Sequence, residues 1–333
     1  MASLGRFPTP VERAEGLGEA LGGLELWLKR DDASGDLYGG NKVRKLELLL
    51  GKAMADGRRR VVTTGAYGSH HVLATSVYAR EVGLETCAVL GPQPVTPHVL
   101  DNLLAAHGRG ATLVPVRTYA AAGPRMVFET ARRRAMLIPP GGSSALGALA
   151  YAGAALELAE QVRRGLCPEP ERLYVALGSS GTMAGLVLGV RLAGLGAEVV
   201  GVRVTPLVAA NEITVAALSA RASLLLSSLA PEAPVRAPIP TTFRVVHDQY
   251  GPGYGHETAA ASRAMSEALD HEGLALDPTY TGKAMAGLIA DCQRRPPSGP
   301  VLFWSTLSSR DLRALTDGVD PRGLHPALAR LFQ

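Results

Sequence analysis

The amino-acid sequence predicts an α/β fold of open, twisted, parallel sheets with helices on both faces. Beyond Gly57 the chain repeats one pattern, in which a short apolar strand is followed by a turn and a helical stretch. The 333 residues are too many for one small core, and with 47% hydrophobic and 19% charged residues the chain can bury a sizeable interior. We therefore expect two domains or one large domain, with ligands bound at the carboxyl ends of the strands.

The first predicted strand covers residues 24–30, which alternate apolar and polar side chains, and a polar loop leads from it to a helix. We expect Asn41 to cap this helix, whose apolar residues recur at three- and four-residue spacing up to a stop at Gly57. Lys42 then lies on the first turn, where the positive end of the helix dipole disfavours an ammonium group. That position suits a lysine that forms a Schiff base through its neutral amine, although this segment alone fits a solvated surface lysine as well.

Seven further strands are predicted downstream, at residues 61–64, 86–90, 112–116, 173–177, 199–204, 243–246 and 301–304. Two of the loops that follow strands, at residues 64–71 and 178–185, share a design. Each offers small side chains and free backbone N–H groups at the start of a helix, which is an anion-binding arrangement. Neither loop is a Walker A or GxGxxG sequence, and one such loop alone could be a packing turn. Two of them together with Lys42 favour a phosphorylated cofactor that carries a reactive carbonyl.

Three later segments complete the prediction. Residues 139–144 precede a long helix that Ser143 or Ser144 would cap. Residues 209–240 are predicted to form a helix and a proline-rich loop without visible chemistry. Tyr254 and Tyr280 lie on glycine-containing loops from which they can reach into a site.

Composition and charge point away from several classes of protein. The formal charge of +4 falls in short basic runs, so we expect no nucleic-acid partner. The three cysteines are widely spaced and form no CxxC pair, so we expect a cytoplasmic protein with no metal site. The N-terminus shows no signal peptide, and the uncharged stretches at 141–156 and 175–190 fall short of a membrane span, so we expect no membrane partner.

Taken together, these segments resemble the fold-type II pyridoxal-phosphate enzymes, whose fold is tryptophan synthase β-like. Within them the chain is similar to the D-cysteine desulfhydrase / 1-aminocyclopropane-1-carboxylate deaminase family. The resemblance covers most of the chain and rests on several motifs in the same order, at residues 7–10, 29–32, 39–47, 64–71, 141–144, 178–185, 253–255, 280–287 and 301–306.

The resemblance implies two open, twisted parallel-sheet domains with pyridoxal 5'-phosphate in the cleft between them. The small domain would be an insertion at residues 50–158, and the large PLP-binding domain would combine residues 1–49 and 159–333. The family also implies an amino-acid substrate and a homodimer.

By the same resemblance, the catalytic residues would be Lys42, which would form the Schiff base, with Ser69, Tyr254 and Tyr280. Lys45 would be structural, and the substrate would be bound by Ser69, His70 and His71. The cofactor would be held by Lys42, Asn41, His70, Gly178, Ser179, Ser180, Gly181, Thr182, Thr281 and Thr306, with the phosphate mainly on backbone N–H groups of residues 178–182.

Thr281 favours one branch of the family. The deaminase branch has a glutamate at the equivalent position, which keeps the pyridine nitrogen protonated, whereas a threonine hydroxyl can only hydrogen-bond that nitrogen. We therefore predict β-elimination from a β-substituted amino acid, of the D-cysteine desulfhydrase kind, with pyruvate, ammonia and sulfide as products. The alternatives are a lyase for L-cysteate or another sulfur amino acid, the cyclopropane deaminase, and a non-catalytic protein that binds the cofactor or an amino acid.

Two segments depart from the family pattern. The family has Gln-Ser-Asn-His where this chain has Gly68, Ser69, His70 and His71, so we expect His70 to donate the hydrogen bond to the cofactor's phenolic oxygen. Near the C-terminus the family has His-Thr-Gly-Gly, and Leu307 here adds bulk where the family has a glycine.

Overall fold

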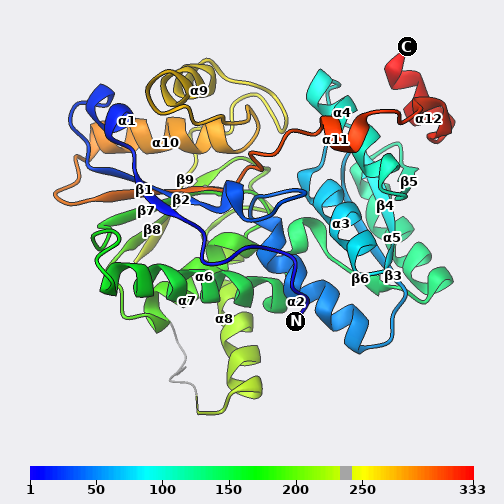
Figure 1. The fold of residues 1–333 in the computed structure, drawn as a ribbon, viewed down its shortest axis with the longest axis horizontal. Helices are drawn as coiled ribbons and strands as arrows, with labels where there is room; N and C mark the ends of the chain where they lie inside the picture. Colours follow the sequence, from blue (N-terminus) through cyan, green and yellow to red (C-terminus); the bar gives the residue numbers. More distant parts are fainter. Residues whose placement is uncertain (233–241) are drawn as a thin grey trace.

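The computed structural model describes residues 1–232 and 242–333, and in them two separate sheets organise the chain (Figure 1). The larger sheet has the strand order β1-β2-β10-β7-β8-β9. All of its neighbouring strands pair in parallel except β1 and β2, which are antiparallel. The strands are β1 (Val11–Arg13), β2 (Leu26–Arg30), β7 (Arg172–Leu177), β8 (Glu198–Arg203), β9 (Phe243–Val246) and β10 (Val301–Ser305).

The smaller sheet has the order β5-β4-β3-β6 and is parallel throughout. Its strands are β3 (Arg60–Ala66), β4 (Glu85–Gly91), β5 (Thr112–Pro115) and β6 (Met136–Leu137). β3 and β4 are almost entirely buried, as expected for central parallel strands that helices cover on both faces.

Helices cover both faces of the larger sheet, and each face has its own apolar core. One core includes Tyr151, Met183 and Trp304 and joins the sheet to three helices; the other includes Leu17, Tyr174 and Met285. The helices of the first face are α6 (Ala145–Arg163), α7 (Gly181–Leu192) and α8 (Glu212–Leu229), and those of the second are α1 (Glu15–Ala20), α9 (Ala259–Glu272) and α10 (Thr281–Arg294).

The smaller sheet packs against helices from three parts of the chain. These are α2 (Lys42–Ala55), α3 (His70–Glu81), α4 (Pro97–Gly108), α5 (Tyr119–Arg133) and, from the C-terminal segment, α11 (Arg313–Thr316) and α12 (Pro326–Ala329). Leu315, Leu324 and Leu328 of the C-terminal segment belong to the same core as Leu46 and Leu73. The chain therefore leaves the larger sheet after β10 and ends against the smaller one (Figure 1).

The predicted fold class is confirmed. Each of the eight predicted strands is present within one or two residues at each end, and the sheets are parallel apart from β1. Sequence analysis missed β1 and β6, which have three and two residues and are too short to show a period. The helix predicted in residues 209–240 is α8, while most of the proline-rich loop falls at 233–241, outside the described residues.

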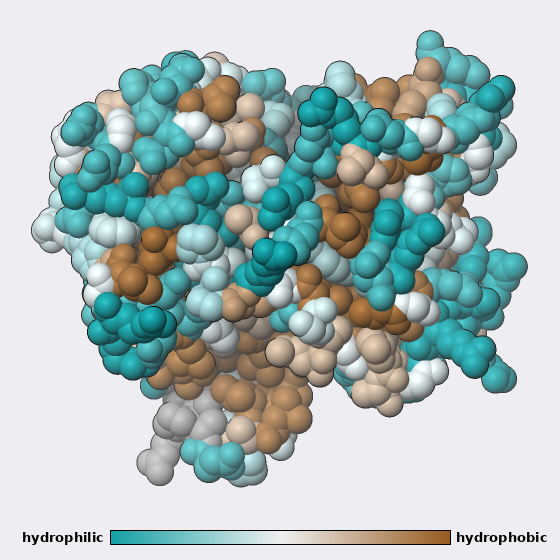
Figure 2. Space-filling view, viewed as in Figure 1, coloured by the Kyte–Doolittle hydropathy of each residue, from teal (hydrophilic) through white to brown (hydrophobic). Residues whose placement is uncertain are grey.

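α8 is the one helix in the described part of the chain that is apolar and long enough to pass a test for a membrane span. That test rests on length and composition alone, and a single such helix is weak evidence. At 18 residues α8 would measure about 27 Å, less than the bilayer core of about 30 Å. Its side chains Ile213, Leu224 and Leu229 are exposed. Figure 2 shows a brown area at the bottom of the molecule, where Figure 1 places α8.

Candidate functional site

A cavity of about 330 Å³ opens between the two sheets, and its walls come from both of them. Every predicted catalytic, cofactor-binding and substrate-binding residue lines it: Asn41, Lys42, Ser69, His70, His71, Gly178, Ser179, Ser180, Gly181, Thr182, Tyr254, Tyr280, Thr281 and Thr306. Segments separated by more than 200 residues therefore meet where the carboxyl ends of parallel strands face each other, as the strand rule predicts.

Lys42 opens α2 at the floor of this cavity, and the turn before it passes close to the end of β10. The backbone N–H of Asn41 donates to the carbonyl oxygen of Thr306 at 3.1 Å. Gly40 has φ of +86°, and a Cβ at this position would lie 2.7 Å from the same oxygen. Only glycine combines that backbone angle with that approach, so Gly40 sets where the lysine enters the cavity.

The side chain of Asn41 does not cap α2, contrary to the prediction. Its Oδ1 accepts a hydrogen bond from Lys42 Nζ at 2.6 Å, and its Nδ2 donates to Thr182 Oγ1 at 2.9 Å. Asn41 therefore links the amine of Lys42 to the first turn of α7 on the opposite wall.

The Lys42 amine is held in a state suited to nucleophilic chemistry. Burial lowers the pKa of Lys42 to about 8, while the nearby Asp277 carboxylate acts in the opposite direction. At pH 8 about half of this amine is therefore neutral, whereas an ordinary lysine is almost fully charged there, and the neutral form is the one that attacks a carbonyl.

A buried ionic network fixes α2 beneath the cavity. Arg44, on α2, donates to both carboxylate oxygens of Asp31 at 3.1 Å and reaches Glu157 of α6 at 2.8 Å. Asp31, which is fully buried, also accepts hydrogen bonds from Tyr151 and Trp304. The members of the network come from the short 3-10 turn directly after β2 (Asp31), from α2 (Arg44), from α6 (Tyr151 and Glu157) and from β10 (Trp304), so the network ties these elements into one support for Lys42.

The loop before α7 has the geometry of an anion site. Ser180 has a left-handed φ of 65°, and its hydroxyl turns away to the carbonyl oxygen of Ala209 and to Thr214. Ser143 accepts from the backbone N–H of Gly181 at 3.1 Å and pairs with Ser179. Beyond Gly181, the N–H groups of the first turn of α7 have no acceptor within the helix, and this turn lines the cavity at the positive end of the helix dipole.

Lys45, one turn after Lys42, adds a second basic group to this wall. Its Nζ is buried and donates to the carbonyl oxygen of Gly141 at 3.1 Å. Burial, followed by the charge of Lys42, lowers the pKa of Lys45 well below its usual range. An anion bound at the start of α7 would offset both effects and favour the charged amine.

The loop before α3 supplies three predicted residues, and each has a local partner. Ser69 caps α3 by accepting from the N–H of Val72 at 3.3 Å. Nε2 of His71 pairs with Thr63 Oγ1 at 2.8 Å, and its buried Nδ1 has no hydrogen-bond partner within the described chain. Both ring nitrogens of His70 are engaged, so the hydrogen bond predicted from His70 to a cofactor oxygen would require one of these contacts to break.

Two tyrosines from distant loops meet on the far wall. Tyr254 and Tyr280 form a short hydrogen bond through their hydroxyl groups, with the rings edge to face at 6.0 Å. Burial raises the pKa of both phenols, so both hydroxyls keep their hydrogen at neutral pH. The pair can donate a hydrogen bond into the cavity from one hydroxyl only, since the other donates within the pair.

Sequence analysis missed Tyr38, Tyr119 and Asp277, which also line the cavity. Asp277 accepts hydrogen bonds from the N–H of Thr281 at 2.9 Å and from its hydroxyl at 2.7 Å. The same hydroxyl accepts from the backbone N–H of Asp277 at 2.9 Å, so it offers at most a lone pair to the cavity. The hydrogen bond predicted from Thr281 to the ring nitrogen of the cofactor would therefore require its bond to Asp277 to break. An aspartate four residues before Thr281 is the signal that could have drawn attention to it, because aspartate is a common helix-start residue.

These walls fit the pyridoxal 5'-phosphate that the sequence resemblance implies. The cavity has a reactive amine at Lys42, an anion-binding helix start with Lys45 beside it, and an orphaned buried nitrogen on His71. A phosphorylated aldehyde needs the first two of these features, and both line the same cavity.

Comparison with known proteins agrees with this fit. The model of a protein family described as "Pyridoxal-phosphate dependent enzyme" matches residues 2–306. The D-cysteine desulfhydrase of Klebsiella pneumoniae (strain 342) is 37% identical over 314 residues, which cover 90% of this chain and 91% of that protein.

Solved structures give the same picture of the fold. A crystal structure described as an ACC deaminase homologue has a TM-score of 0.79 and 29% identity, covering 92% of this chain and 91% of that one. A threonine deaminase from Solanum lycopersicum has a TM-score of 0.65 at 14% identity, covering 94% and 83%. The latter is a likeness of fold alone.

Proposed function

The chain belongs to the family of pyridoxal-phosphate dependent enzymes, and on that premise we propose that it is a lyase that releases pyruvate, ammonia and sulfide from D-cysteine. The observation that carries the proposal is the position of Lys42, which is half-buried, has a lowered pKa and lines the same cavity as the anion-binding start of α7. The curated relative at 37% identity supports the substrate.

When bound, pyridoxal phosphate supplies the electron sink that makes loss of a proton from the substrate's α carbon possible. Lys42 would hold the cofactor and then act as the base that takes this proton. Asn41 would orient the amine through its 2.6 Å hydrogen bond. General-base catalysis by a positioned amine is typically worth about 10²–10⁴-fold.

The remaining residues would bind and orient. The backbone of Gly178, Ser179, Ser180, Gly181 and Thr182, with Thr281 and Thr306, would hold the cofactor. Ser69 and His71 would receive the substrate carboxylate near the start of α3, where N–H groups favour an anion. The Tyr254–Tyr280 pair would flank the substrate and direct one hydroxyl toward the leaving sulfur.

A second candidate, ring opening of 1-aminocyclopropane-1-carboxylate, is favoured by the likeness to the ACC deaminase homologue. Against it stands Thr281, which places a hydroxyl where that branch has a carboxylate. Lyases for L-cysteate or other sulfur amino acids and a non-catalytic amino-acid-binding protein are further alternatives.

One assay separates these candidates. The purified protein loaded with pyridoxal phosphate would be given D-cysteine, L-cysteine, L-cysteate, chloroalanine and 1-aminocyclopropane-1-carboxylate, and 2-oxo acid and sulfide would be measured. We expect pyruvate with sulfide from D-cysteine, and no activity in Lys42→Ala. 2-Oxobutyrate from the cyclopropane substrate with no pyruvate from D-cysteine would replace the first proposal by the second.

We also propose the organisation in which this enzyme works. The larger sheet would belong to a domain of residues 1–49 and 159–333, and the smaller sheet to a domain of residues 50–158. The packing departs from these bounds, because α2, α11 and α12 pack in the core of the smaller sheet and α6 packs against the larger one. The protein would be a cytoplasmic homodimer, supported by three unpaired cysteines and by the exposed apolar side chains of α8. Light scattering from the purified protein would test the dimer.

A further inference from the structure

A chain of hydrogen bonds leads from the cavity wall to the surface of the molecule. The Tyr38 hydroxyl lies 2.6 Å from His70 Nδ1, and His70 Nε2 lies 3.1 Å from His98 Nε2. Tyr38 and His70 line the cavity, whereas His98 is exposed on the first turn of α4. The two imidazoles thus bridge the cavity and water.

Asn102 determines which way the hydrogens point along this chain. Its Nδ2 donates to the carbonyl oxygen of Gly68 at 2.8 Å, and a carbonyl oxygen can only accept, so the orientation of the amide is set. The same Nδ2 lies 3.2 Å from His98 Nε2, which must therefore be an acceptor without a hydrogen of its own.

Because His98 Nε2 carries no hydrogen, the positions of the other hydrogens follow. The hydrogen between the two rings belongs to His70 Nε2, so His70 Nδ1 is bare and accepts from the Tyr38 hydroxyl. His98 must carry its hydrogen on Nδ1. All donors then point outward, from Tyr38 through His70 and His98 to water.

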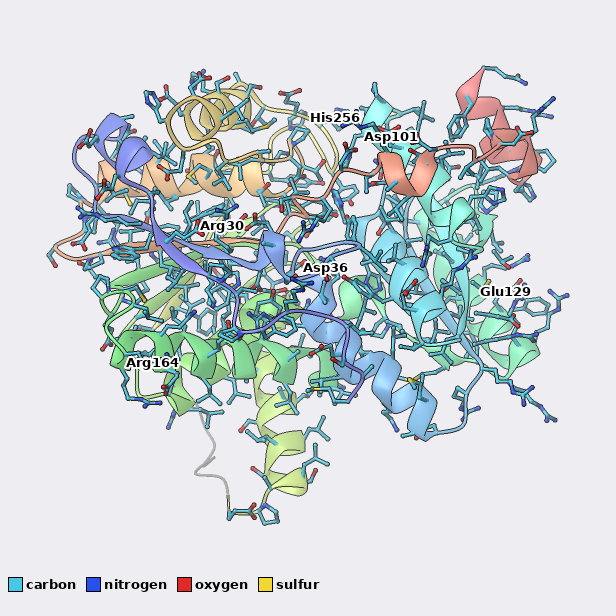
Figure 3. The ribbon with its side chains drawn as sticks, in the orientation of Figure 1. Arg30, Asp36, Asp101, Glu129, Arg164 and His256 are labelled. Atoms are coloured by element: carbon cyan, nitrogen blue, oxygen red, sulfur yellow. The ribbon has the colours of Figure 1, made fainter. Side chains whose placement is uncertain are left out.

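The surroundings keep His70 neutral, as this series of hydrogen bonds requires. Burial, followed by the neighbouring His98, lowers the pKa of His70 to about 3. The loop of Tyr254 lies close to the segment before α4, with Gly255 beside Pro94. Figure 3 labels His256 of that loop and Asp101 of α4 in the same region.

We propose that Tyr38, His70 and His98 form a proton relay between the cavity and solvent. In the outward step the Tyr38 O–H bond breaks as an N–H bond forms at His70 Nδ1, and the hydrogen of His70 Nε2 passes to His98 Nε2. The hydrogen of His98 Nδ1 passes to water, and the Tyr38 oxygen takes a proton from the molecule bound in the cavity. One proton moves, and no electrons are transferred.

The outward step leaves every hydrogen of the relay pointing inward and sets the new N–H of His98 Nε2 against the N–H of Asn102 Nδ2, so this arrangement is the less stable one. The next transfer must bring a proton in and thereby resets the relay. This alternation suits the reaction on which the inference rests. Elimination from D-cysteine releases one proton when the substrate's ammonium group becomes an amine. It later takes up one proton at the β carbon on the way to pyruvate.

The first test is independent of turnover. Nitrogen NMR of the ¹⁵N-histidine-labelled holoenzyme at pH 8, with peaks assigned through His70→Asn and His98→Ala, reports which ring nitrogen carries hydrogen. We expect hydrogen on Nε2 of His70 and on Nδ1 of His98. Hydrogen on Nε2 of His98, or a positively charged His70, would overturn the relay whether or not D-cysteine is the substrate.

The second test uses the reaction. His98→Ala should lower kcat by about 10²-fold, the lower end for general acid–base catalysis, with KM nearly unchanged. Added imidazole should restore part of the lost rate, because the exposed site can admit it. His271→Asn, an exposed histidine of α9 outside the cavity lining, serves as the control and should keep the wild-type rate. A loss without rescue, or no loss, would contradict the relay, whereas wild-type protein that leaves D-cysteine unchanged would contradict the proposed function.

Discussion

Nζ of Lys42 donates a hydrogen bond to Oδ1 of Asn41 over 2.6 Å, so the side chain that precedes α2 serves the next residue and not the helix. The helix start gives up a cap that is typically worth about 1 kcal/mol. In exchange the amine gains a neutral acceptor that orients it without adding a charge that would raise its pKa. The following predictions test this site and its support.

Replacing Asn41 by Asp should make Lys42 less reactive at neutral pH. A carboxylate at this distance favours the ammonium form and should raise the pKa of Lys42 from about 8 by about one unit or more. The pH midpoint for covalent attachment of pyridoxal phosphate to the apoprotein, trapped with borohydride and located by mass spectrometry, should rise accordingly. Asn41→Ala, which adds no charge, is the control, and an unchanged midpoint in Asn41→Asp would show that the two side chains are apart.

Asp277→Asn should act in the opposite sense. The carboxylate of Asp277 raises the pKa of Lys42 against the effect of burial, so its removal should lower that pKa further and move the attachment midpoint below about 8. Asp248→Asn, which removes an exposed carboxylate paired with Arg294, should leave the midpoint in place. A midpoint that rises in Asp277→Asn would refute this electrostatic assignment.

Asp31→Asn should destabilise the protein more than any exposed ion-pair change. It leaves the buried guanidinium of Arg44 without its bidentate partner, and breaking such a pair costs about 3–5 kcal/mol. Asp36→Asn breaks an exposed pair with Arg6 and should cost less than about 1 kcal/mol. Figure 3 shows Asp36 between the two sheets. Urea denaturation of both variants would measure the difference in their free energies of unfolding.

Gly40→Ala should harm both stability and cofactor binding. The alanine would have to adopt the left-handed φ of Gly40, and its Cβ would lie 2.7 Å from the carbonyl oxygen of Thr306. Together these two effects should lower the free energy of unfolding by about 3 kcal/mol and displace the start of α2. Gly57→Ala is a matched control, because Gly57 also has a positive φ but open space around it, and should cost about 1 kcal/mol. Equal unfolding free energies for the two variants would show that the approach to Thr306 does not matter.

Sequence reasoning succeeded where the signal was local and periodic. The strands that form the centres of both sheets have apolar runs bounded by turns, and the two glycine loops follow strands and open helices as expected. The family resemblance built on these features implied one site for Lys42 and residues 178–182, and both line the cavity.

It failed where the decisive partner is distant in the chain. Asn41 has the residue type of a cap, but Thr182 and the Lys42 amine compete for its side chain, and no local pattern reveals that. Tyr38 and Tyr119 look like ordinary apolar residues in sequence, and only the meeting of the two sheets brings them to the cavity. The engagement of both His70 nitrogens depends on His98, which lies 28 residues away.

The final residues of the chain matter for anyone who wishes to dissect the protein. A fragment that stops after β10 would keep every strand of the larger sheet, yet it would strip Leu315, Leu324 and Leu328 from the hydrophobic interior of the other half. Shortening the C-terminus should therefore make the smaller sheet and its helices, which carry Ser69 and His70, unfold first. This holds although the deletion begins at the end of β10, in the larger sheet.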